Sequence, residues 1–200
     1  MKNPGRSDNT GQSSGPFLER PDWQQWLDAL RDPAWQPVSG LQWFAVAGGC
    51  VLMLLVRKWS GQDWVFLLDN ANLALHEAGH PLVGLFSERL GVYGGTLFQL
   101  LFPALLTLHF TREGHPSGVS VAVIWLGENL LNIARYMADA RAQVLPLVGG
   151  DHDWTEIFSR WGVLQNDLRI ALWTRLLGYS LMLAALFWLW LRYQAEDSTD

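Results

Sequence analysis

The chain has 200 residues, of which 50% are hydrophobic and only 16% are charged, and its formal net charge is −5. The length suits one domain, and the charged fraction lies well below the roughly 25% of ordinary soluble domains. The acidic balance excludes nucleic acid as an expected partner. The single Cys50 excludes both an intrachain disulfide and a cysteine metal cluster.

Two segments precede the first apolar run. Residues 1–20 are rich in Gly, Ser, Asn and Pro and are expected to form a disordered tail. The basic start is not followed by the apolar core of a signal peptide. Residues 21–40 place Trp or Leu at i, i+3, i+4 and i+7 from Trp23, which predicts a short amphipathic helix. This helix would lie on the membrane surface or pack on the body of the protein.

Five long apolar runs follow, and a spanning helix needs ~20 mostly apolar residues. The runs cover residues 41–56, 64–86, 96–110, 117–139 and 170–191. The expected fold is therefore all-α, a polytopic transmembrane helical bundle with about five spans and short interfacial helices.

The remaining segments complete this organisation. A glycine-rich turn is expected at 91–95, and residues 140–168 are expected to be a loop with a short amphipathic helix. The membrane-embedded domain would cover residues 41–192, and residues 193–200 would form a C-terminal tail.

The second run contains His76-Glu77-Ala78-Gly79-His80, an H-E-x-x-H pattern. Residues i and i+4 share one face of a helix, so both imidazoles can reach one metal ion. Glu77 lies beside that face and suits a general base acting on metal-activated water. Ionisable groups in an apolar span are costly and usually functional. The pattern therefore favours a Zn²⁺ site over a helix with two unrelated histidines.

The residues around the motif add two expectations. Pro81 has no N–H to donate to the carbonyl of Glu77, so a kink or a helix end is expected there. Asn72 and Asp69 precede the motif on the same stripe of the helix. A ligating His usually donates its other ring N–H to an acceptor, and either residue could be that acceptor or a capping group.

The fourth run carries Glu128, Asn132, Arg135 and Asp139 at steps of 4, 3 and 4, so they share one helix face. Such a face is expected to point into the bundle, away from lipid. Asp139 or Glu128 would then be a metal ligand or a supporting group. Alternatively, the charged members form a self-neutralising network that only ties helices together.

A zinc site with two His from one helix needs a third protein ligand from elsewhere. The segment after Gly149-Gly150 offers Asp151, His152 and Asp153. His152 is the preferred third ligand, because a neighbouring carboxylate can orient it. Asp153 is the alternative, and it could instead cap a helix that begins at Trp154. A polar loop that ends in a helix cap, without any ligand, is the structural alternative.

The motif in an apolar span, followed by a Gly-rich segment and further spans, resembles the intramembrane zinc metallopeptidases of the site-2 protease type. The resemblance covers residues 64–140. In that family a distal Asp in a Leu-Asp-Gly context completes the metal site, with an Asn-Pro element nearby, and the spans of this chain contain neither. The resemblance implies a membrane-embedded zinc-dependent hydrolase, foremost a metallopeptidase, acting on a membrane-protein or peptide substrate.

Residues 70–170 also resemble bacterial membrane proteins of unassigned function that pair H-E-x-G-H with a later H-D-W, here His152-Asp153-Trp154. This second resemblance implies the lipid bilayer of a bacterial inner (cell) membrane as the environment, and it implies no substrate. Two alternatives stay open: a zinc-dependent lipid or amide hydrolase, and a non-catalytic membrane scaffold with structural histidines.

Overall fold

The computed structural model describes residues 34–148 and 150–197. This part of the chain is all-helical, as expected, and contains no strand. The elements in chain order are α2 (Gly40–Trp59), α3 (Phe66–Gly84), α4 (Glu88–Arg112), α5 (Pro116–Ala138), α6 (Asp153–Arg160), the short 3-10 helix η1 (Leu164–Asn166) and α7 (Asp167–Asp197).

Four helical segments are long and apolar enough to cross a membrane: α2, α4, α5 and the continuous segment Leu164–Ala195. Many of their large apolar side chains are exposed on the outside of the bundle, among them Leu41 and Phe44 on α2 and Leu183 and Phe187 on α7. An outward apolar surface of this extent is unfavourable in water and favourable against lipid. The protein is therefore an integral membrane protein. The fifth expected span, α3, is a 19-residue helix that carries the polar residues of the candidate site.

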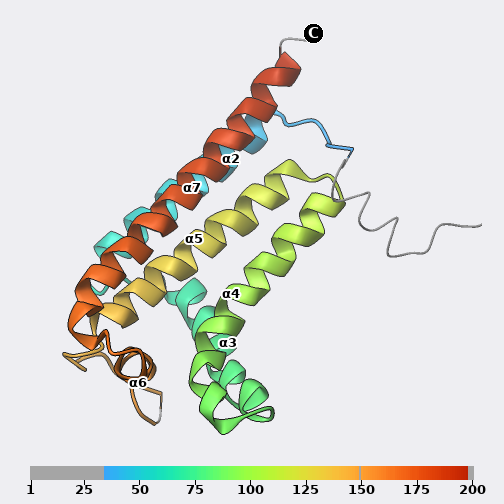
Figure 1. Cartoon of the computed structure of the whole chain (residues 1–200). Helices are drawn as coiled ribbons and strands as arrows, with labels where there is room; N and C mark the ends of the chain where they lie inside the picture. Colours follow the sequence, from blue (N-terminus) through green and yellow to red (C-terminus); the bar gives the residue numbers. More distant parts are fainter. Residues whose placement is uncertain (1–33, 149, 198–200) are drawn as a thin grey trace, which may run out of the picture.

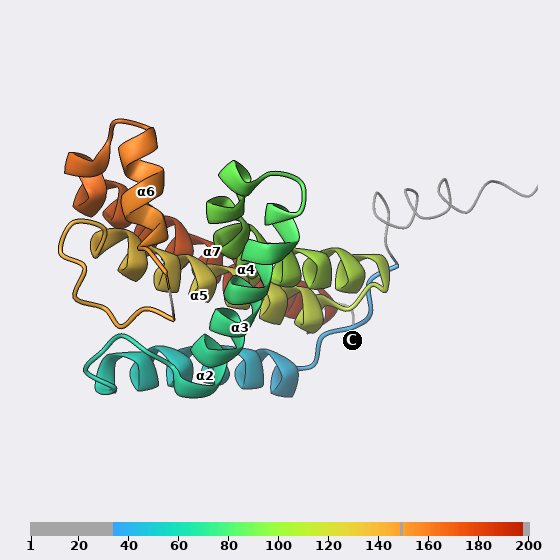
Figure 2. The ribbon, with the colours of Figure 1, turned by 90° about the horizontal axis from the view of Figure 1, so that it is seen from below.

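The helices form a bundle in which α5 and α7 lie side by side (Figure 1). Helix α2 packs against α7 and α5, whereas α4 packs against α5 and α3. The short α6 contacts α4 and α5, and in Figure 2 it lies on the same side of the bundle as the turn between α3 and α4. This arrangement brings α3 and α6 close together, although they are far apart in the sequence.

Glycines allow the closest helix contacts. A Cβ atom added to Gly127 on α5 would lie 2.7 Å from the carbonyl oxygen of Gly178 on α7, and the reverse distance is also 2.7 Å. On α3 and α4, a Cβ added to Gly79 or Gly94 would overlap the carbonyl of the other. Small residues let helix backbones approach in this way inside membranes. The two pairs join α5 to α7 and α3 to α4 without intervening side chains.

The expected glycine-rich turn at 91–95 is wrong, because these residues lie inside α4. The chain reverses earlier, between the end of α3 at Gly84 and the start of α4 at Glu88. The glycines serve the helix contact instead of the turn. Pro81 does not end the helix at the site either. Helix α3 continues to Gly84, and the Leu85 N–H donates to the Pro81 carbonyl at 3.0 Å.

The ends of the described chain also differ from expectation. Most of the helix expected at 21–40, and the tail expected at 1–20, lie outside the described residues. The described residues 34–39 are not helical, and α2 begins at Gly40 with a capping box between Ser39 and Gln42. At the other end α7 continues to Asp197, so the expected tail at 193–200 begins as helix.

Candidate metal centre

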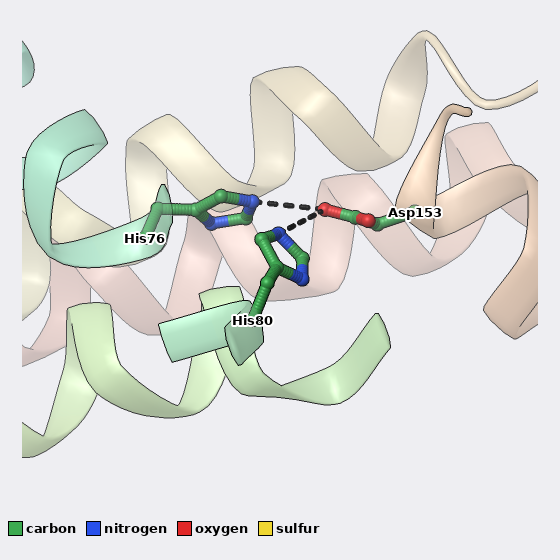
Figure 3. A group of neighbouring side chains, drawn as sticks. All are labelled: His76, His80 and Asp153. Carbon is green, nitrogen blue, oxygen red and sulfur yellow. Dashed lines mark hydrogen bonds and ion pairs between the residues drawn. The ribbon is translucent and has the colours of Figure 1, made fainter. Parts of the chain in front are cut away.

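His76 and His80 lie one turn apart on α3, with their ring centroids 4.9 Å apart. Their Nε2 atoms face the same oxygen, Oδ2 of Asp153 at the start of α6, at 2.8 and 3.3 Å (Figure 3). The three potential ligand atoms lie within 4.8 Å of one another. His76 is buried, while the other two are partly buried. The structure thus gathers two imidazoles and a carboxylate into one group that can hold a metal ion.

Tyr136 on α5 holds Asp153 in this place. Its hydroxyl accepts a hydrogen bond from the Asp153 backbone N–H at 3.1 Å, and its ring lies edge-on to His76. The Tyr136 ring also lies against that of His152, with centroids 4.2 Å apart. Burial raises the pKa of the Asp153 carboxyl, but hydrogen bonds with His76 and His80 outweigh burial and hold the pKa below its ordinary value. The group therefore presents an ionised carboxylate to the two histidines.

A chain of hydrogen bonds defines the tautomer of His76. The Asp69 carboxylate can only accept, so the Asn132 side chain donates its NH₂ to it at 2.7 Å. The Asn132 oxygen then accepts from Gln99 Nε2 at 3.0 Å, which leaves the Gln99 oxygen facing His76 Nδ1 at 3.3 Å. His76 must donate through Nδ1, and Nε2 is the nitrogen that faces Asp153 and that could bind a metal ion.

His80 has the same arrangement through a simpler contact. Its Nδ1 lies 2.9 Å from the backbone carbonyl oxygen of Gly91 on α4, which can only accept. With Nδ1 engaged as a donor, Nε2 is the His80 nitrogen that faces Asp153 and that could bind a metal ion. Without a metal ion, a proton on either Nε2 atom is donated to the Asp153 carboxylate. A metal ion bound by the three groups would take the place of that proton. Two His nitrogens, one carboxylate oxygen and an open fourth position form a ligand set found in catalytic zinc sites.

His152, the third ligand preferred from the sequence, does not face the histidine pair. It is the N-cap of α6, where its Nδ1 accepts from the Thr155 N–H at 3.3 Å, and its Nε2 lies 3.4 Å from Oδ2 of Asp139. Burial lowers the pKa of His152 against the opposing effect of Asp139. Helix α6 begins at Asp153, one residue before the expected Trp154. The capping role therefore falls to His152, and the Asp153 side chain is free to face α3.

Asp139 anchors the loop that follows α5. Its two carboxylate oxygens accept the backbone N–H groups of Val144 and Leu145 at 2.9 and 3.0 Å. Together with the contact to His152, these bonds hold both ends of the segment between α5 and α6. The structure thus places Asp139 behind His152 as an anchor of the loop, and not at the histidine pair.

Glu128 lies deeper in the bundle, where it pairs with Arg57 from the end of α2 at 3.1 Å. Its other oxygen accepts from Asn72 Nδ2 at 2.7 Å, and the Asn72 oxygen accepts from the Trp125 indole N–H at 2.8 Å. Asn72 therefore supports Glu128 and makes no hydrogen bond to His76 within the described chain. The expected network of Glu128, Arg135 and Asp139 is not formed, because Arg57 neutralises Glu128.

Glu77 lines a cavity of about 330 Å³ beside the histidine pair. His76 of α3, Gln99 of α4, and Arg135 and Tyr136 of α5 line the same cavity. The segment Leu145-Pro146-Leu147-Val148, held in place by Asp139, closes one side. The cavity can therefore admit a small substrate to the side of the site where both His76 and Glu77 are found.

The sequence interpretation missed three groups that support the site: Gln99, Tyr136 and the carbonyl of Gly91. The sequence does contain one sign of the role of Gln99, because it is a polar residue within the apolar run 96–110. The structure shows that its side chain is buried. Nothing in the sequence indicates which backbone carbonyl His80 contacts. No protein-family model matches the chain, and no curated protein or solved structure matches it.

Proposed function

We propose that the protein is a membrane-embedded zinc-dependent hydrolase in which His76, His80 and Asp153 hold the ion and Glu77 is the general base. One observation carries the proposal. Two imidazole Nε2 atoms and an ionised carboxylate converge beside a cavity that Glu77 lines. Their Nδ1 atoms already have acceptors, so the Nε2 lone pairs are available to a cation.

The chain's own residues supply the remaining steps of hydrolysis. A zinc ion held by His76, His80 and Asp153 would supply Lewis-acid activation of a carbonyl and of a water molecule. Glu77 follows His76 directly in α3 and lines the same cavity, so it can take the water's proton and pass it to the leaving group. Gln99 and the Gly91 carbonyl keep the imidazoles oriented during this exchange. The apolar segment Leu145–Val148 limits the access of bulk water.

A peptide bond is the proposed substrate bond, in a membrane-protein or peptide substrate. The H-E-x-x-H pattern inside an apolar bundle supports this, because intramembrane metallopeptidases of the site-2 protease type use the same pattern. A lipid or amide hydrolase with the same metal site is the alternative, distinguished by the bond that is cleaved. The proposed location is the bacterial inner membrane.

The test is the metal content and turnover of the purified chain beside the Glu77→Gln variant. We expect one zinc per chain in both proteins by elemental analysis, and loss of about 10²–10⁴-fold in turnover of a fluorogenic peptide library in the variant. Glu88→Gln, at the exposed start of α4, is the matched control and should behave as wild type. A wild-type protein without metal would refute the proposal. Undiminished turnover in Glu77→Gln would remove Glu77 as the base, and turnover confined to ester-linked lipids would favour the alternative.

A further inference from the structure

Arg135 is a cation in the cavity wall that forms no ion pair with a carboxylate of the described residues. Its guanidinium lies 5.4 Å from the centroid of the Trp64 ring, and it forms no ion pair or hydrogen bond with any residue that the structure describes. Stacking on an aromatic face fixes the plane of a guanidinium and leaves its edge N–H groups available. Arg135 is half-buried and lines the same cavity as Glu77. Its donors are therefore held in one plane, ready for an anion.

The charges in the cavity wall indicate which anion fits. Among the lining residues Arg135 is the only Lys or Arg, and Glu77 is the only Asp or Glu. Two of the nearby amides are already committed, because Asn132 donates to Asp69 and Gln99 donates to Asn132. A single guanidinium with two parallel donors matches a carboxylate. A phosphate carries more charge and is usually bound by several cations, whereas the lining residues include one.

The size and the other walls of the cavity indicate what carries the carboxylate. A volume of about 330 Å³ lies at the lower end of the ~300–1,000 Å³ of small-molecule sites. Its apolar lining includes Leu73 and Ile133 and the segment Leu145–Val148. This space suits one short apolar group beside a charged terminus more than a long extended chain.

We propose that Arg135 binds the terminal carboxylate of a peptide whose last residue is hydrophobic, so that the enzyme removes residues from a free C-terminus. This inference rests on the proposed function. Water adds to the carbonyl carbon of the last peptide bond, and the C–N bond breaks. Glu77 transfers the water's proton to the leaving amine. The products are a free hydrophobic amino acid, whose own carboxylate stays on Arg135, and a peptide shortened by one residue.

A binding experiment tests this inference without requiring turnover. The probes are N-acetyl-L-leucine and N-acetyl-L-leucinamide, which differ only in the carboxylate, measured by equilibrium dialysis against the purified full-length protein in detergent. We expect the acid to bind at least about tenfold more tightly than the amide, as for one charge-assisted hydrogen bond. The same preference should persist after EDTA treatment, because it resides on Arg135 and not on a metal.

Three variants locate the preference. Arg135→Gln should bind acid and amide equally, whereas Arg135→Lys should keep a reduced preference because it retains the charge but not the planar pair of donors. Arg169→Gln, an exposed arginine at the start of α7, is the control and should match wild type. Equal binding of the two probes by wild type, or an undiminished preference in Arg135→Gln, would overturn the inference. Tighter binding of glycerol 3-phosphate than of N-acetyl-L-leucine would also overturn it in favour of a phosphate-bearing lipid.

The two proposals fail in distinguishable ways. Zinc and peptide turnover without any acid preference would refute the role of Arg135 and keep the hydrolase. An acid preference that depends on Arg135, in a protein without zinc or turnover, would refute the hydrolase and leave a carboxylate-binding membrane protein.

Discussion

Asp69 makes Nδ1 of His76 a hydrogen-bond donor, although Asn132 and Gln99 lie between them. Each hydrogen bond in this chain has only one allowed direction. The Asp69 carboxylate accepts, so each of the two amides donates its NH₂ group toward Asp69 and accepts with its oxygen from the next residue. The proposed ligand nitrogen of His76, Nε2, is thus selected by an acidic residue two turns earlier on α3. The relationship makes Gln99 a positioning residue for metal binding.

Replacing Gln99 by Leu should weaken zinc binding by about 10–100-fold, the usual effect of removing a group that orients a metal ligand. The reason is that His76 Nδ1 loses its acceptor, and the ring can rotate or change tautomer. Zinc affinity is measured by competition with a chromophoric chelator. Gln194→Leu, at an exposed position of α7, is the control. An unchanged affinity in Gln99→Leu would show that the tautomer is fixed by other means.

Asp153→Ala and His152→Ala should differ in zinc binding. Asp153→Ala removes a proposed ligand atom and should release the ion, as should His76→Ala and His80→Ala. His152→Ala removes the N-cap of α6 and should cost about 0.5–2 kcal/mol of stability while the protein keeps its zinc. Elemental analysis after gel filtration measures the zinc content, and thermal unfolding measures the loss of stability. The opposite ranking would restore His152 as the third ligand.

Gly95→Ala should reduce zinc binding through a steric clash alone, because the substitution adds a methyl group and no charge. A Cβ atom at this position would lie 2.5 Å from Nε2 of His76, closer than real Cβ atoms approach a neighbour. The imidazole would have to move away from Asp153, and zinc stoichiometry should fall. Gly48→Ala on α2 is the matched control, because a Cβ there meets nothing within 4 Å and Ala favours helix by up to ~1 kcal/mol. Full zinc content in Gly95→Ala would mean that the ring can shift without loss of binding.

Arg57→Met should destabilise the bundle by roughly 3–5 kcal/mol, because it leaves the Glu128 carboxylate buried without its cation. The adjacent Lys58 is exposed, so Lys58→Met removes the same charge with little effect. Thermal unfolding in one detergent compares the pair. Equal midpoints would show that the amide of Asn72 is sufficient to support Glu128.

The sequence predicted the helical class, the apolar helices and the placing of both histidines, because all three follow from local periodicity. A helical repeat is enough to set His76 and His80 on one face. Which residue faces the histidine pair depends on whether α6 begins at Asp153 or Trp154, a shift of one residue that exchanges the roles of cap and proposed ligand. Local sequence does not define such a boundary, since His152 and Asp153 can both cap a helix.

The side-chain partners of Glu128 and Arg135 also could not be predicted from residue spacing within one helix. Spacing on α5 suggests that these two residues and Asp139 neutralise one another, but α2 brings Arg57 to Glu128 from 71 positions away. The loop backbone occupies Asp139 instead. Both outcomes depend on how separate helices pack, and the glycine pairs that determine this packing are recognisable as such only once the helices are placed.

The distance along the chain between the histidine pair and Asp153 has a consequence for biosynthesis. His76 and Asp153 are 77 positions apart, and α4 and α5 lie between them. When α3 has left the ribosome, the third donor and the loop that closes the cavity have not yet been made. A nascent chain that stops before α6 carries both histidines and Glu77 but lacks the carboxylate between them. The centre is therefore assembled late, after α4 and α5 have been synthesised, and an unfinished chain does not carry the complete set of donors.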